Sequence, residues 1–182
     1  MNRALTVTLA VLLTTATAQL TPPNLPARPP SAPLVIPPDD SVTLPAVIGQ
    51  ASEVILYAPT LTRADVTEAL RVLMTARNAR VYVITTKSAL NERDSYPLRL
   101  ALIGATTYVT KPHANAVPFV LVNGRAMRGP GVTTTGTAAW LPDSEGKRLR
   151  DWAVQVTKTT KPVNVVAAVR EWVKVTQGID LR

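Results

Sequence analysis

The sequence offers few side chains that could carry out a reaction. Its 182 residues include one histidine, His113, and no cysteine. A thiolate metal site and a cysteine nucleophile are therefore excluded, and chemistry that needs two imidazoles would require a second copy of the chain. We find no glycine-rich phosphate loop, no serine nucleophile elbow and no paired-carboxylate metal site. The sequence thus predicts no metal and no cofactor.

Basic side chains are a more prominent feature. The chain has 20 Lys and Arg against 12 Asp and Glu, a formal charge of +8, which favours anionic partners such as nucleic acid or lipid headgroups. Residues 95–142 include no Asp or Glu, yet they contain Arg99, Lys111, Arg125 and Arg128. Together with Asn123, the last three are candidates for binding phosphate. The alternative is that they only keep an exposed hairpin soluble or protect a sheet edge.

The N-terminus has the pattern of an export signal. Arg3 precedes a nearly unbroken apolar run at 4–13, and small residues at 16 and 18 precede Gln19. We interpret residues 1–18 as a cleaved signal peptide, because the apolar run is far shorter than a membrane-spanning helix; an uncleaved anchor is the alternative. Residues 19–45 hold nine of the sixteen prolines and are predicted to be a disordered linker. The product would be periplasmic or extracellular, with no transmembrane segment after cleavage.

Residues 46–182 are predicted to form one α/β domain. The apolar run at 54–58 is typical of a strand buried on both faces. A capping-box spacing at 62–65 then predicts a helix, and a second β-branched run follows at 81–85. A strand, a helix and a strand in this order predict a βαβ unit with parallel strands.

The second half of the domain continues the alternation. Ser95 and Pro97 predict the start of a helix, and Asn123-Gly124 predicts a tight hairpin. The expected elements are a helix at 98–103, strands at 106–109, 118–122 and 125–128, a loop at 129–139, a strand at 152–157 and a helix from Pro162. The basic cluster Lys147, Arg148 and Arg150 is predicted to lie in a solvated loop, and Trp140 is the exposed aromatic that could stack on a base.

This order of elements resembles the phospholipase D superfamily, in particular its single-motif branch of secreted bacterial nucleases. The resemblance covers about residues 41–176. It depends on the element order, on Ala69-Leu70 in the first helix, on the strand that ends at Asn123-Gly124, and on the final strand and the helix that contains a Trp. It implies a mixed β-sheet flanked by helices and a phosphodiesterase ancestry. In this family a His attacks phosphorus, a second His protonates the leaving group, and Lys and Asn hold the phosphate, so single-motif members are dimers.

The family signature, His-x-Lys-x4-Asp followed by Gly-Ser-x-Asn and a distal Glu, is almost erased here. If Asn123 takes the Asp position, the His position falls on Ala116 and the Lys position on Pro118. Residues 129–132 read Gly-Pro-Gly-Val where Gly-Ser-x-Asn is expected, and Glu145 is in place of the distal Glu. His113 lies three residues before the His position, which on a strand is about 10 Å away and on the opposite face.

Three functions remain open at this point. The leading interpretation is an exported phospholipase D-like domain that has lost its catalytic residues and binds phosphodiester polyanions, either nucleic acid or lipid headgroups. The alternative is an active, metal-independent phosphodiesterase that uses His113 across a homodimer. The third is a structural or subunit-interface protein whose basic charge is incidental.

Overall fold

The structure is a computed structural model and describes residues 43–111 and 117–180. The predicted signal peptide (1–18), most of the predicted linker (19–45) and His113 lie outside the described residues. The helices are α1 (Leu44–Ile48), α2 (Ala64–Arg77), α3 (Lys87–Leu90), α4 (Tyr96–Leu102), α5 (Asp143–Thr159) and α6 (Val165–Gln177), with a short 3-10 helix at Pro130–Val132. The strands are β1 (Glu53–Ala58), β2 (Arg80–Thr85), β3 (Thr106–Val109), β4 (Phe119–Val122), β5 (Arg125–Arg128) and β6 (Ala139–Trp140).

One mixed sheet organises the domain, in the strand order β3-β2-β1-β4-β5-β6. The predicted βαβ unit is confirmed, since β1 and β2 are parallel and every residue of β1 is buried. Strand β3 is parallel to β2, whereas β4, β5 and β6 are each antiparallel to their preceding neighbour in the sheet. The predicted hairpin is also confirmed, because Asn123 and Gly124 both adopt positive φ angles, as a two-residue type I′ turn requires.

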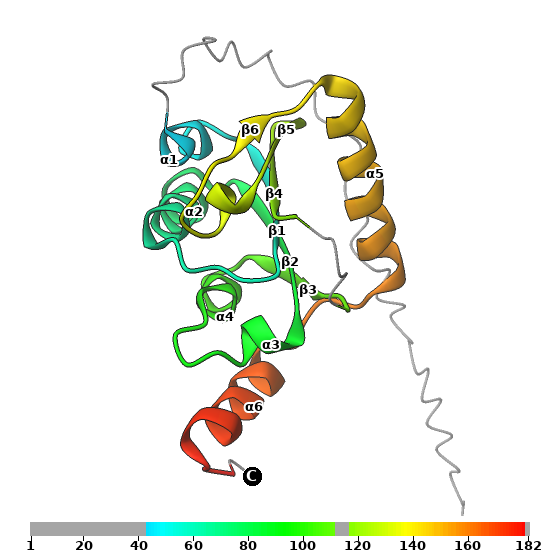
Figure 1. Cartoon of the computed structure of the whole chain (residues 1–182). Coiled ribbons are helices and arrows are strands. Elements are labelled where there is room, and N and C mark those ends of the chain that lie inside the picture. Colours follow the sequence, from blue (N-terminus) through cyan, green and yellow to red (C-terminus); the bar gives the residue numbers. More distant parts are fainter. Residues whose placement is uncertain (1–42, 112–116, 181–182) are drawn as a thin grey trace, which may run out of the picture.

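Helices cover both faces of this sheet (Figure 1). Helices α1, α2 and α4 lie over one face and contribute Ile48, Leu70 and Leu100, respectively, to a core with alternate strand residues. Helix α5 lies over the other face, where Ala153 and Val156 pack against an aromatic cluster. In that cluster Tyr57, Phe119 and Trp152 contact one another at ring-centroid distances of 5.2–5.7 Å. The two faces alternate along each strand, as the strand period requires.

The predicted strand at 152–157 is wrong, because these residues lie inside helix α5. Their alternation of apolar and polar residues suggested a strand, and their Val and Thr content favours one. In the structure the buried residues are instead Gly146, Ala153, Val156 and Thr157, which have the spacing of one helical face. Asp143 and Glu145 in the first turn favour the start of this helix. The basic cluster at 147–150 is therefore on a helix and not in a loop.

Smaller differences concern the ends of elements. Helix α2 has Arg63 as its N-cap without a side-chain cap bond, so the predicted capping box at 62–65 is not formed. Ser95 does cap α4, where its hydroxyl accepts from the Leu98 amide at 3.1 Å. Helix α1 begins at Leu44, just inside the segment predicted to be linker. Within the described residues, no helix combines the length and apolarity needed to cross a membrane.

Candidate functional site

The carboxyl edge of the parallel strands is where the fold favours a ligand site. At this edge β1 has a parallel neighbour on one side and an antiparallel neighbour on the other, so the chain direction changes there. The two segments predicted to match the family signature lie side by side at this edge, since the Gly129 amide donates to the Pro118 carbonyl at 3.0 Å. In the family these segments carry the phosphate-binding Lys and Asn, whereas the matching positions here would be Pro118 and Val132.

The loop that follows β5 closes tightly over itself. The Gly131 amide donates to the Thr137 carbonyl at 3.0 Å, and a Cβ at Gly129 would lie 2.4 Å from that same carbonyl oxygen. Val132, which the sequence analysis aligned with the family Asn, is fully buried. The Thr133 carbonyl accepts from the Thr62 amide at 2.9 Å, which fastens the loop to the start of α2. Residues 129–133 are thus closely packed by backbone contacts.

Asn123 lies at the other end of β4, beside the start of β1. Its Oδ1 accepts from the Ser52 amide at 3.0 Å, the Ser52 hydroxyl at 3.0 Å and the Glu53 amide at 3.2 Å. About five residues of extended chain, roughly 17 Å, separate this turn from Pro118. The structure therefore gives Asn123 a role in fixing the hairpin and does not bring it together with the carboxyl edge.

Arg125 and Arg128 are three residues apart on β5 and lie on opposite faces of the sheet. The Arg125 guanidinium lies over the Trp140 ring, 5.1 Å from its centroid, and Trp140 packs against the core under α2. Arg128 shares its face with Ala126, which belongs to the core under α5. Because the two positions are about 10 Å apart along the strand and point to opposite faces, they cannot hold one phosphate together. Trp140 is partly buried, and one face of its ring is covered by the Arg125 guanidinium.

Arg128 instead meets a partner from α5 that the sequence analysis did not select. A cavity of about 310 Å³ is lined by Arg128, Glu145, Arg148 and Leu149. Arg148 was missed because its segment was assigned to a loop. With the helix recognised, the spacing of Glu145, Arg148 and Leu149 would have placed the three side chains on one side of α5.

Lys111 lies at the carboxyl edge on the far side of the sheet. It follows β3, where the Thr110 amide donates to the Thr85 carbonyl at 2.8 Å, and it is exposed. Four strand spacings, about 19 Å, separate β3 from β5. Lys111 and Arg128 are therefore at the same edge but too far apart to contact one phosphate. Of the predicted residues, Arg128 lines a cavity together with a second basic group, Arg148.

A buried ion pair occupies the opposite edge of the sheet. The Arg150 Nη1 atom donates to Glu53 Oε1 at 2.8 Å, while Glu53 Oε2 is buried without a hydrogen-bond partner. Burial also raises the pKa of the nearby Tyr82 hydroxyl. The described residues contain no group of three or more His, Cys, Asp or Glu that could hold a metal ion.

The comparisons agree with this architecture. The fold is phospholipase D-like, a six-stranded mixed sheet flanked by helices, as the resemblance implied. A solved structure with this fold is that of Nuc, a phospholipase D family member from Salmonella typhimurium. The two structures have a TM-score of 0.53 and 12% sequence identity, over 65% of this chain and 87% of Nuc. No protein-family model matches the sequence, and a search of curated proteins found no significant match.

Proposed function

We propose that this chain is an exported phospholipase D-like domain without phosphodiesterase activity, which binds phosphodiester polyanions through Arg128 and Arg148. The observation that carries the proposal is the Gly129–Pro118 hydrogen bond. This bond supports the proposal because it brings the two segments predicted to match the family signature to one edge of the sheet, and neither segment contains a nucleophile or a cation. The N-terminal signal pattern supports export.

The loss of activity follows from what phosphoryl transfer needs. A nucleophile must reach phosphorus, and fixed donors must stabilise the charge that develops on the phosphate oxygens. At the signature positions, Pro118 has no amide hydrogen and Val132 is apolar and buried. The Gly129 amide hydrogen is used by the chain itself. At Pro118, Gly129 and Val132, a phosphate would therefore meet no free donor.

The binding role follows from the cavity beside β5. The cavity is lined by two guanidinium groups and one carboxylate, so the formal charge of its lining is +1. A guanidinium binds phosphate oxygens with two parallel hydrogen bonds, and it keeps its charge at any working pH. Further phosphates along the same polymer would find Lys111 at the same edge, about 19 Å away by strand spacing. A polymer of phosphodiesters fits this arrangement better than a single phosphate does.

The test is the salt dependence of binding to a single-stranded DNA oligonucleotide, measured by fluorescence anisotropy. We expect affinity to fall steeply as salt increases. Arg128→Gln and Arg148→Gln should each weaken binding roughly tenfold or more, because a charge-assisted hydrogen bond contributes about 1.5–3 kcal/mol. Glu145→Gln should tighten binding, since it removes the carboxylate from the same cavity.

Arg77→Gln is the matched control, because it removes the same charge from the exposed end of α2. Binding that is undetectable even at low salt would overturn the proposal. A loss in Arg77→Gln equal to that in Arg128→Gln would also do so, because binding would then reflect net charge alone. In that case the structural or subunit-interface role would become the better account.

A further inference from the structure

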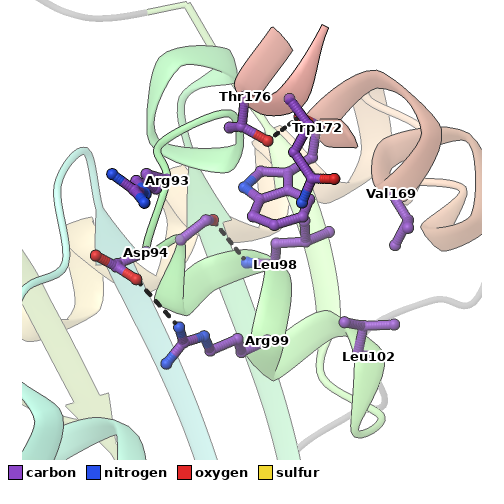
Figure 2. Close-up of a pocket in the computed structure, with 10 residues that line it drawn as sticks. Arg93, Asp94, Leu98, Arg99, Leu102, Val169, Trp172 and Thr176 are labelled. Atoms are coloured by element: carbon purple, nitrogen blue, oxygen red, sulfur yellow. Dashed lines mark hydrogen bonds and ion pairs between the residues drawn. The ribbon is translucent and has the colours of Figure 1, made fainter. Parts of the chain in front are cut away.

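A second cavity lies far from the signature positions in sequence, between α4 and α6 (Figure 2). It has a volume of about 490 Å³ and is lined by the segment before α4, by α4 itself and by one side of α6. This volume is within the range of small-molecule sites, about 300–1,000 Å³. None of the residues discussed as phosphate ligands lines it.

The cavity exists because α6 is only partly covered. None of its residues is buried, although its apolar residues recur at helical spacing. Val169 and Trp172, which face the cavity, are half-buried, and Leu102 on α4 keeps 57% of its surface exposed. An apolar helix face of this kind normally packs against a core. Here it forms a wall of an open site.

Trp172 gives this wall a fixed shape. Its indole Nε1 donates to the Glu92 carbonyl at 2.7 Å, across 80 residues of sequence. The ring is therefore held against the segment before α4, and its surface forms part of the cavity with Leu98 and Leu102 (Figure 2). A pre-ordered apolar surface binds an apolar chain at a lower entropic cost than a loose one does.

The charged groups at this cavity favour an anion. Arg93, Asp94 and Arg99 line it, and Arg99 pairs with Asp94 at 3.4 Å. The two arginines and one aspartate give the lining a formal charge of +1. Among the described residues, no carboxylate is paired with Arg93. The Ser95 hydroxyl is engaged with the Ala89 carbonyl and the Leu98 amide. Arg93 is thus the cation available for a ligand.

We propose that the α4–α6 cavity binds an amphiphile with one anionic head group and an acyl chain of medium length. The chain lies on Leu98, Leu102 and the Trp172 ring, and the head group, a carboxylate or a phosphate, pairs with Arg93. This site is independent of the polyanion site at Arg128, which is formed by different elements of the fold. The same head-group chemistry is found in free fatty acids and in lysophospholipids.

The test compares four ten-carbon probes below their micelle concentrations: decanoate, decyl phosphate, decanol and decyltrimethylammonium. The readout is the NMR signal of the Trp172 indole N–H in the full chain, assigned by its loss in Trp172→Phe. We expect saturable shifts with both anions, at least fivefold weaker binding of decanol, and no saturable shift with the cation. Tighter binding of decanoate than of decyl phosphate would identify a fatty acid as the source, and the reverse would identify a lysophospholipid.

Variants separate the two parts of the proposed contact. Arg93→Gln should reduce anion binding to the level of decanol, whereas Leu102→Asn should weaken all binding probes together. Both side chains are exposed, so neither change should unfold the domain. Arg170→Gln is the matched control, since Arg170 lines a different cavity, on the other side of α6. Equal binding of the anionic and cationic probes, or an unchanged affinity in Leu102→Asn, would overturn the proposal.

Discussion

The ion pair between Glu53 and Arg150 is expected to contribute substantially to the free energy of unfolding. It fastens α5 to the first strand, since the two residues are 97 positions apart in the sequence. Replacing Arg150 with Met keeps a similar volume and removes the charge. The Glu53 carboxylate, whose side chain is only 8% exposed, would then be buried without a counter-ion.

The expected cost can be worked out from these exposures. Breaking a fully buried pair by removing one partner costs about 3–5 kcal/mol. The Arg150 side chain keeps 21% of its surface exposed, so water can reach part of the stranded site, and we expect about 2–3 kcal/mol. For a domain of this size, that corresponds to a fall in Tm of roughly 6–10 °C.

The assay is urea unfolding followed by circular dichroism, with Lys147→Met as the control. Lys147 is exposed on the same helix and pairs with no described carboxylate, so its loss should change the free energy of unfolding by less than about 0.5 kcal/mol. The double variant Glu53→Leu with Arg150→Met should recover most of the loss, because an apolar pair does not strand a charge. An Arg150→Met protein as stable as the parent would refute this reasoning.

Three further predictions concern the loops and the pH dependence. Gly129→Ala should lower the free energy of unfolding by more than about 2 kcal/mol, measured by urea unfolding, because Gly129 has φ +141° and a Cβ there would meet the Thr137 carbonyl at 2.4 Å; an unchanged midpoint would contradict the loop packing. Asn123→Gly keeps the positive φ but removes the oxygen that three donors share, so the free energy of unfolding should fall by about 1–3 kcal/mol. Asn123→Asp keeps an acceptor oxygen and should reduce the free energy of unfolding by a smaller amount. Burial raises the pKa of Glu92 in the folded protein, so the folded state favours the neutral carboxyl group. The stabilisation from this group is therefore complete below the unfolded pKa of about 4.3 and is lost as pH rises through the folded pKa. Glu92→Gln should remove that part of the pH dependence and leave the protein more stable at pH 7, whereas an identical pH profile would show that Glu92 is solvated.

Much of the sheet could be predicted from the sequence because its signals are local. The continuous apolar runs of β1 and β2 and the Asn123-Gly124 turn each satisfy a strict geometric demand. Helix α5 could not be predicted in the same way. Its C-terminal half reads as a strand from residue type, and only its contacts with the aromatic cluster under it reveal the helical face.

The candidate site was predictable only in part, because it depends on tertiary placement. The sequence identified Arg125 and Arg128 together, but the strand period puts them on opposite faces. Arg148 became a candidate only when α5 brought it beside Arg128. The cavity between α4 and α6 has no local sequence signal. It forms because the rest of the domain leaves part of the apolar face of α6 uncovered.

The most direct test of the central claim is hydrolysis of a chromogenic phosphodiester by the purified protein, with and without chelator, alongside His113→Ala. We expect no turnover above the uncatalysed rate in any of these samples, because the predicted signature positions hold Pro118 and a closed glycine loop. Turnover that resists chelator and disappears in His113→Ala would contradict it. The chain would then be a phosphodiesterase with a displaced histidine.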